Sequence, residues 1–411
     1  MATKTEQNAI AYLQTPQAIR DRSQQLFELA CQNQLDHFAC DLTKLPEVAA
    51  YVLQVIQANY PDLKVPFHSR WRHFEVDGES RLTLLEPELS QQNPIERARI
   101  LFDLAVTSVL LDAGAGAQWQ YREPETGQVF QRSEGLAIAS FHSFKSGLFS
   151  SRPDLPWQAD AVGLTQLTGA RLGEAFQVSD TNSLVGLSGR VTLLQKLGHA
   201  LEKSPELFGN DLPRPGHLVD YLLTQAQDGA LPASAILQAI LRGLGDIWPG
   251  RITLGGVPLG DVWLHPKLPN TEVGSQLVPL HKLSQWLTYS LLEPLQELGL
   301  TITDLDDLTG LAEYRNGGLF VDLGVLVPKH EAVFSQAHSP DSSLIVEWRA
   351  LTVILLDRVA DAIRQTLNLS AAELPLAKVL QGGTWTAGRQ IAARRRGSPP
   401  PIQLASDGTV F

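Results

Sequence analysis

Residues 343–366 read SLIVEWRALTVILLDRVADAIRQT, and their apolar side chains recur at the spacing of a long helix. From Ala350 to Leu356 nearly every side of this predicted helix is apolar, which indicates burial in a core. Glu347 and Arg349 nevertheless bring charge into the apolar faces, and buried charges are costly unless they are paired. We interpret these two residues either as part of a structural ion pair or as part of the wall of a site.

Similar spacing occurs in many other segments, so the predicted fold class is mainly α. Helices are expected over 16–31, 46–59, 95–114, 183–201, 230–244 and 281–298. Gly114 fits the C-terminal stop of the third of these helices. Pro294 is expected to kink or end the last one.

Short strands are predicted between the helices. HFEVDGESRLTL (73–84) carries the hairpin signal Asp77-Gly78, and WQYREPETGQVFQRS (119–133) is expected to turn at Thr126-Gly127. ITLGGVPLGDVW (252–263) has the composition of further short strands. Regular βαβ alternation, a G-x-G-x-x-G motif and a P-loop are missing from the sequence. We therefore predict a mainly α fold with small β-hairpins, as a single large domain over 1–411, with a division into 1–133 and 134–411 as the alternative.

The composition is that of a globular protein with an acidic balance. Of 411 residues, 44% are hydrophobic, and 33 Lys and Arg against 44 Asp and Glu give a net charge of −11. Such a balance disfavours binding to nucleic acid or to an anionic membrane. No apolar run reaches the roughly 18 residues that a membrane span needs, and the first residues lack an apolar signal region. We expect a soluble, cytoplasmic protein.

Cysteine usage fits the same compartment. Cys31 and Cys40, with His37 between them, are too few for a structural zinc site and form no disulfide framework. We expect no metal and no cofactor.

Three segments combine polar residues in patterns that suit a ligand. In the helix over 281–298, Lys282, Gln285 and Tyr289 fall within a wedge of about 60°, whereas Trp286 lies on the apolar face. This wedge is either a binding face for a polar ligand or a solvated face.

The second segment is FHSRWRHFEV, residues 67–76, in which Arg70 and Arg72 flank Trp71. In an extended chain both guanidinium groups share one side, where they can hold a phosphate while Trp71 stacks on a planar group. The third segment carries Arg122, Arg132, Ser133 and Glu134 before Gly135. It predicts either an anion at a helix N-terminus or a helix with Ser133 as its N-cap.

The stretch DLDDLTGLAEYRNGGLFVDLGVL, residues 304–326, places Glu313, Tyr314 and Arg315 between an acidic patch and a glycine pair. Polar residues between ordered segments indicate a site. Paired carboxylates are suggested here by Glu313 together with Asp304, Asp306 and Asp307. Whether Asp112, Asp304, Asp306 or Asp407 joins the site stays open at this level.

Long motifs over the whole chain resemble the uracil-catabolism family of bacteria and fungi, long labelled a domain of unknown function. They include HSRWRHFE, LLDAGAG, WQYREPETGQVFQRSEGLAIAS, VPLGDVW, LVPLHKLSQWLTYSLLEPL, LTGLAEYRNGGLFVDLGVL and VEWRALTV. In fungi the family belongs to a route in which uracil becomes a ribonucleotide, its ring is opened, and urea is released from a ribosylurea-type intermediate.

LTGLAEYRNGGLFVDLGVL and VEWRALTV are also similar, more distantly, to segments of the queuosine salvage glycohydrolases, which cut an N-ribosidic bond in a nucleoside 5′-phosphate. That family's catalytic acid and site lysine fall on Glu313 and Lys282. Here Glu replaces Asp, and Asn316-Gly317-Gly318 replaces Val-Pro-Gln. The resemblance implies a largely helical, DNA-glycosylase-like architecture.

Together the resemblances imply an N-glycoside hydrolase that releases urea from a ribosylurea or its 5′-phosphate. Glu313 would stabilise positive charge on the sugar or orient water, and Lys282 would help the leaving group depart. The candidates for substrate binding are Arg70, Trp71, Arg72, Arg132, Gln285, Trp286, Tyr289, Tyr314, Arg315, Glu347 and Arg349.

The alternatives are an amidohydrolase of the ureido group and a non-catalytic nucleoside-phosphate-binding protein. The expected partner is a small riboside or ribose 5′-phosphate, with no nucleic acid and no membrane. The sequence leaves the oligomeric state unknown.

Overall fold

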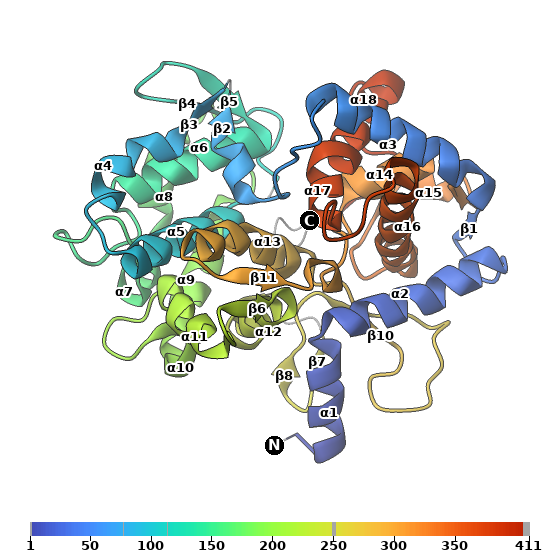
Figure 1. Cartoon of the computed structure of the whole chain (residues 1–411), viewed down its shortest axis with the longest axis horizontal. Coiled ribbons are helices and arrows are strands. Elements are labelled where there is room, and N and C mark those ends of the chain that lie inside the picture. Colours follow the sequence, from blue (N-terminus) through green and yellow to red (C-terminus); the bar gives the residue numbers. More distant parts are fainter. Residues whose placement is uncertain (1, 77, 113, 249–251, 406–411) are drawn as a thin grey trace. The chain divides into compact units, whose positions relative to one another are not determined.

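The computed structural model describes residues 2–76, 78–112, 114–248 and 252–405, and in these residues helices predominate over short paired strands (Figure 1). This confirms the mainly α class with small β-hairpins. The chain folds into two compact units, and each is assembled from separate stretches of sequence. Among the described residues, unit 1 comprises 2–68, 252–285 and 304–405, and unit 2 comprises 69–76, 78–112, 114–248 and 286–303.

The helices of unit 1 are α1 (Lys4–Leu13), α2 (Pro16–Cys31), α3 (Leu45–Asn59), α14 (Tyr314–Asp322), α15 (Ala332–Ser335), α16 (Ser343–Leu367), α17 (Leu376–Val379) and α18 (Trp385–Arg396). Its strand pairs are β1 (Phe38–Cys40) with β12 (Leu326–Pro328), β7 (Thr253–Leu254) with β8 (Val257–Pro258), β9 (Val262–Leu264) with β10 (Leu277–Pro279), and β13 (Ala337–His338) with β14 (Gln403–Leu404). The first three pairs are antiparallel and the last is parallel. Short turns are η1 (Leu42–Lys44), η6 (Leu305–Asp307) and the π-helical η7 (Leu380–Thr384).

Helix α16 forms the centre of unit 1, where it packs against α2, α3 and α14 (Figure 1). All side chains from Ala350 to Leu356 are buried, as the sequence predicts. Burial of each Leu, Ile or Val side chain stabilises the folded state by about 1.5–3 kcal/mol. The helix begins where Ser342 caps the backbone N–H of Ile345, and it ends at Asn368, whose φ is +55°.

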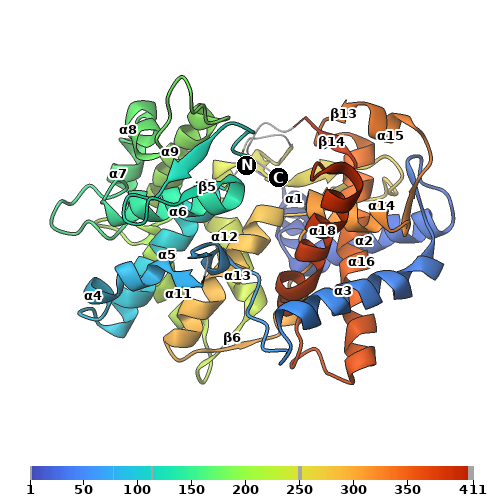
Figure 2. The same ribbon diagram turned by 90° about the horizontal axis from the view of Figure 1, so that it is seen from above.

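Helix α14 lies against both α16 and α18 (Figure 2). A Cβ on Gly317 would come within 2.6 Å of Nε1 of Trp348 in α16, and a Cβ on Gly388 in α18 would come within 2.3 Å of the carbonyl oxygen of Arg315. The two glycines therefore allow the close packing that holds the start of α14 in place.

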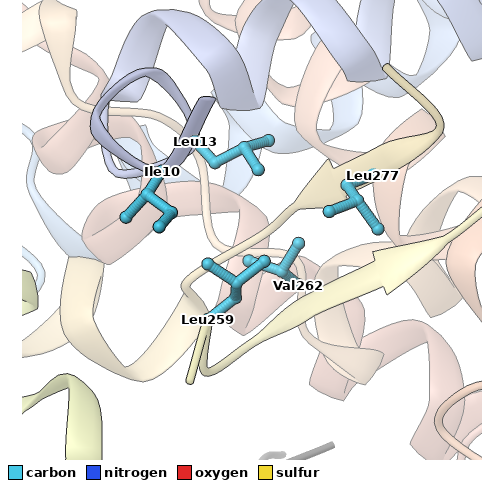
Figure 3. Close-up of a cluster of buried hydrophobic side chains, with 5 residues drawn as sticks. All are labelled: Ile10, Leu13, Leu259, Val262 and Leu277. Carbon is cyan, nitrogen blue, oxygen red and sulfur yellow. The ribbon is translucent and has the colours of Figure 1, made fainter. Parts of the chain in front are cut away.

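A small apolar cluster supports the segment before β9. It consists of Ile10, Leu13, Leu259, Val262 and Leu277 (Figure 3). Leu259 and Val262 lie on either side of Asp261 in the sequence, so the cluster fixes the backbone that carries this carboxylate.

The helices of unit 2 are α4 (Glu86–Leu89), α5 (Pro94–Leu110), α6 (Arg132–Lys145), α7 (Ala161–Thr165), α8 (Gly169–Ala175), α9 (Leu187–Lys203), α10 (Pro205–Phe208), α11 (Leu218–Gln225) and α12 (Ala233–Leu244). Its strand pairs are β2 (Glu75–Val76) with β3 (Glu79–Ser80), β4 (Gln120–Arg122) with β5 (Val129–Gln131), and the parallel pair β6 (Ala230–Pro232) with β11 (Thr301–Thr303). Short turns are η2 (Arg70–His73), η3 (Arg81–Leu84), η4 (Pro215–His217) and η5 (Gly245–Ile247). Helix α13 (Lys282–Glu297) begins in unit 1 and continues in unit 2 from Trp286.

The structure tests several predicted turns and helix ends. Both hairpins form, and Gly127 turns the second with a φ of +72°, whereas Asp77 of the first lies outside the described residues. Helix α5 ends at Leu110 rather than continuing to Gly114. Pro294 does not end α13, which continues to Glu297.

The structure differs from two local conformations that the sequence analysis considered. Ser133 is not an N-cap, because α6 already begins at Arg132 and Gln131 occupies the cap position without a side-chain bond. Residues 70–73 are not extended but form the 3-10 turn η2, so Arg70 and Arg72 do not share one side of a strand. Within the described part of the chain, no helix is long and apolar enough to span a membrane.

Candidate active site

Glu313 lies at the N-cap of α14, and its side chain accepts two hydrogen bonds from the backbone of that helix. Oε2 accepts from the N–H of Arg315 at 2.8 Å, and Oε1 accepts from the N–H of Asn316 at 2.6 Å. The free N–H groups and the dipole at a helix start favour a negative charge there. The carboxylate is therefore held in one orientation by the helix it caps.

Burial sets the proton affinity of this carboxylate. Glu313 is only 8% exposed, and burial raises its pKa above the ordinary value of 4.5. The charge of Lys282 and the two backbone hydrogen bonds act in the opposite direction without cancelling the effect of burial. A desolvated acid with a shifted pKa and a specific cation nearby is a candidate for a functional site.

Lys282 is the first residue of α13, and its backbone is fixed by Asp261. The carboxylate of Asp261 accepts from the N–H of Lys282 at 2.9 Å and from Nε1 of Trp263 at 2.6 Å. It also forms a bidentate ion pair with the guanidinium of Arg349, with both N–O distances at 2.7 Å. Burial acts to raise the pKa of Asp261, but Arg349 and the other donors outweigh it and hold the pKa at about 2.

Arg349 connects this carboxylate to the residue that precedes Glu313. Its Nε donates to the carbonyl oxygen of Ala312 at 3.0 Å, while its two terminal nitrogens bind Asp261. Asp261 and Arg349 therefore position Lys282 and Glu313 relative to each other. The sequence analysis missed Asp261, although a lone acid in the apolar run VPLGDVW was a usable signal.

Glu347, the other charge predicted on α16, has different partners. It is fully buried, accepts from the backbone N–H of His37 at 3.1 Å, and lies 3.4 Å from Nε2 of the equally buried His265. Arg349 therefore forms a structural ion pair, as one of its two predicted roles required. Its partner is Asp261 and not Glu347.

Three further predicted binding residues belong to unit 1. Tyr314 and Arg315 follow Glu313 in the chain, and Gln285 is hydrogen-bonded to Thr309, four residues before Glu313. Gln285 is fully buried and donates from Nε2 to Oγ1 of Thr309 at 2.8 Å. Tyr314 is 36% exposed, and the guanidinium of Arg315 lies 4.9 Å from the centre of its ring. Arg315 also donates to the carbonyl oxygen of Ser398 at 2.8 Å. Sequence reasoning missed the buried Asn316 and Thr309 of this group.

The remaining predicted binding residues belong to unit 2. Arg70 is fully buried, pairs with Asp112 at 3.1 Å, and donates from Nε to Oγ of Ser108 at 2.7 Å. Its guanidinium lies 5.6 Å from the ring centre of Trp286. Asp112 therefore has a clear role as the counter-ion of Arg70.

The neighbours of Arg70 in η2 face other groups. Nε1 of Trp71 donates to the carbonyl oxygen of Ser290 at 2.7 Å, and Arg72 pairs with Glu293 at 2.7 Å. Tyr289 is fully buried in α13. Arg132, by contrast, is exposed at the start of α6.

The acidic patch before Glu313 anchors a turn. Asp306 pairs with Arg364 and accepts from the backbone N–H of Leu376 at 2.8 Å, and the carbonyl oxygen of Asp307 accepts from Arg20 at 2.6 Å. Asp304 adopts a left-handed conformation, with φ at +52°. The observed partners of Asp306 thus tie residues 304–308 to other helices. Asp407 lies outside the described residues.

A cavity of about 880 Å³ lies elsewhere in unit 1, between α1, α2 and residues 270–274. Its lining includes Tyr12, Arg22 and Glu272, and none of its lining residues is among the predicted site residues. In the described part of the chain, no group of three or more His, Cys, Asp or Glu side chains is arranged to hold a metal ion.

Comparison with known proteins gives matches over the full length. The family model described as "Protein of unknown function (DUF1688)" matches residues 12–411. Protein urg3 of Schizosaccharomyces pombe is 40% identical over 423 residues, which cover 100% of both chains. Uracil catabolism protein 4 of Lachancea kluyveri is 38% identical over 442 residues, which cover 99% of this chain and 100% of the relative. The chain therefore belongs to the DUF1688 family.

Proposed function

We propose that this protein is an N-glycoside hydrolase of uracil catabolism that cleaves the N-ribosidic bond of a ribosylurea or its 5′-phosphate. The name of the Lachancea kluyveri relative supports the pathway. The similarity of Glu313 and Lys282 to the site residues of queuosine salvage glycohydrolases supports the reaction type and stays a prediction. The small-molecule substrate, the cytoplasmic location and the DNA-glycosylase-like architecture belong to the same proposal.

One observation carries the proposal most directly. Glu313 is a buried carboxylate whose pKa is raised by burial, yet it is fixed by two backbone N–H groups and lies within electrostatic reach of Lys282. A cap alone needs no buried acid, because Ser, Thr, Asp and Asn are the preferred N-cap residues. A desolvated carboxylate beside an ammonium group suits a reaction that needs both a base and an acid.

The proposed step is a hydrolysis in which one bond forms and one breaks. Positive charge develops on the ribose as the bond from C1′ to the urea nitrogen lengthens, and the Glu313 carboxylate stabilises that charge. Water adds to C1′ and gives a proton to Glu313. The ammonium group of Lys282 gives a proton to the departing nitrogen, so that neutral urea leaves. Solvent then returns a proton to Lys282 and removes one from Glu313.

A product assay tests the proposal. Purified protein is incubated with ribosylurea and with its 5′-phosphate, and urea, ammonia and free sugar are followed together. We expect equal release of urea and sugar from one of the two compounds. Ammonia without urea would contradict the proposal in favour of ureido hydrolysis. Binding without any product would favour a non-catalytic role.

A further inference from the structure

Two buried side-chain oxygens, one on Gln285 and one on Asn316, have no hydrogen-bond partner among the described residues. Gln285 is fully buried and Asn316 is 1% exposed. Within the described residues, neither Oε1 of Gln285 nor Oδ1 of Asn316 has a hydrogen-bond partner. Leaving a buried acceptor unpaired costs about 1–3 kcal/mol, so each such atom in a folded protein calls for an explanation.

The hydrogen bonds of the two amide nitrogens fix which atom is left over. The Gln285 amide faces Oγ1 of Thr309, and that hydroxyl donates its own proton to the carbonyl oxygen of Gly310 at 3.2 Å. With this proton on Gly310, the Gln285 atom that faces Thr309 is the N–H donor. The Asn316 amide faces the carbonyl oxygen of Leu311 at 3.2 Å, which only accepts. Turning the Asn316 amide over would place its oxygen against the carbonyl oxygen of Leu311, and turning the Gln285 amide over would take the Thr309 hydroxyl away from Gly310. In the observed orientation both unpaired atoms are carbonyl oxygens.

Both amides are anchored on the same short piece of chain. Thr309 and Leu311 are two residues apart, and the backbone leads directly from them to Glu313. Asn316 also donates its backbone N–H to the Glu313 carboxylate. The amide nitrogens of Gln285 and Asn316 thus both bond residues 309–311, just before Glu313, and Lys282 lies one helical turn before Gln285 on α13.

We propose that Oε1 of Gln285 and Oδ1 of Asn316 accept hydrogen bonds from the N–H groups of a ureido head group. The inference rests on the proposed function and assigns the residues that recognise the urea end of its substrate. A ureido group attached to ribose carries N–H bonds on both of its nitrogens. An intact uracil ring in a nucleotide offers a single N–H between two carbonyl oxygens, which would face the two amide oxygens unfavourably. The pair therefore selects a ring-opened substrate over a closed pyrimidine.

Equilibrium binding tests this assignment independently of turnover. The ligands are ribosylurea and N-ribosylacetamide, each with and without a 5′-phosphate. The acetamide replaces the terminal NH₂ by a methyl group of similar size and so removes two donors without adding bulk. Dissociation constants are measured by calorimetry in the Glu313→Gln variant, which prevents hydrolysis during the titration. We expect the urea to bind at least tenfold more tightly than the acetamide in one phosphorylation state.

Substitutions in the same background assign the preference to the two amides. Gln285→Met and Asn316→Leu should each reduce the preference below threefold. Gln158→Met is the matched control, because the amide of this buried glutamine is bonded at both ends, to Asp160 and to Arg214. It should leave the preference unchanged, with thermal unfolding confirming that each variant is folded. Equal binding of the urea and the acetamide in both phosphorylation states, no binding of ribosylurea with or without its 5′-phosphate, or a preference that survives both substitutions would overturn the inference.

The two assays distinguish a failure of this binding inference from a failure of the proposed hydrolase function. If the wild-type protein releases urea and sugar but the preference is absent, only the role of Gln285 and Asn316 is wrong. If the preference is present but the wild-type protein gives no product, the binding site stands and the hydrolase proposal falls.

Discussion

Glu313 combines two properties, a structural one and an electrostatic one. It caps α14 through two backbone hydrogen bonds, and it carries a carboxylate that burial makes harder to ionise. Capping alone is worth about 0.5–2 kcal/mol and is served by smaller side chains. The extra methylene of Glu and its burial beside Lys282 are better explained by a role in chemistry.

The first prediction concerns this residue. Glu313→Gln should lower turnover of the ribosylurea substrate at least about 100-fold, because the amide neither carries the charge nor accepts the proton. Circular dichroism and the thermal midpoint should show that the variant is folded. Glu331→Gln is the matched control, since Glu331 is an exposed acid at the N-cap of α15. It should turn over like wild type, and equal activity of both variants would remove Glu313 from the mechanism.

The raised pKa also predicts how stability changes with pH. The folded state holds the proton of Glu313 more tightly than the unfolded state, whose pKa is near the ordinary 4.5. The folded state therefore loses stability as pH rises from about 4.5 through the higher folded pKa, and above that the penalty is constant. The free energy of unfolding of wild type minus that of Glu313→Gln should fall across this window. Guanidinium denaturation at a series of pH values measures it, and a flat or rising difference would contradict the account.

At the scale of elements, the pair Asp261–Arg349 links the start of α13, the first half of α16 and the entry to α14. The two residues are 88 positions apart in sequence, so no local pattern predicts their contact. The periodicity of the helices, in contrast, is local. The predicted helix over 16–31 coincides with α2, and that over 46–59 begins one residue after α3 does. Helix α14 escaped prediction because its Gly317-Gly318 pair has poor helix propensity.

Asp261→Asn should destabilise the protein by about 3–5 kcal/mol, because it leaves the guanidinium of Arg349 buried without its counter-ion. It should also lower turnover, since Lys282 and Glu313 lose their common support. The matched control is Asp62→Asn, which removes an exposed carboxylate 3.7 Å from Lys64 and should change stability by less than about 1 kcal/mol. Equal stabilities of the two variants in guanidinium denaturation would show that the pair does not hold these elements together.

Gly317→Ala tests the close packing of α14 on α16. The added methyl group meets Nε1 of Trp348 at 2.6 Å, so the helices must move apart at a cost of about 1–3 kcal/mol. Gly189 in α9 is the control, because a Cβ there meets nothing within 4 Å. Gly189→Ala should stabilise the protein by up to about 1 kcal/mol through helix propensity. Thermal unfolding of both variants separates the effects, and a stabilised Gly317→Ala variant would show that the contact yields without cost.

At the scale of the whole molecule, composition and periodicity lead to the mainly α class, but they do not reveal how the chain is divided. The chain passes from one unit to the other several times. One of these crossings falls inside α13, between Gln285 and Trp286. Arg70, in unit 2, shows the same limit. Its residue type suggests a phosphate contact, whereas in the folded chain it is buried against Asp112. Which charges become partners depends on tertiary contacts, and these are not encoded in local spacing.

The central claim is that the whole protein breaks the bond between ribose and urea, and isotope labelling tests it most directly. Wild-type protein turns over ribosylurea or its 5′-phosphate in water enriched in heavy oxygen, and mass spectrometry locates the label in the products before exchange. The account predicts that the label appears in the hydroxyl at C1 of the sugar and that urea is unlabelled. Label in carbamate or carbon dioxide, with the riboside bond intact, would contradict it.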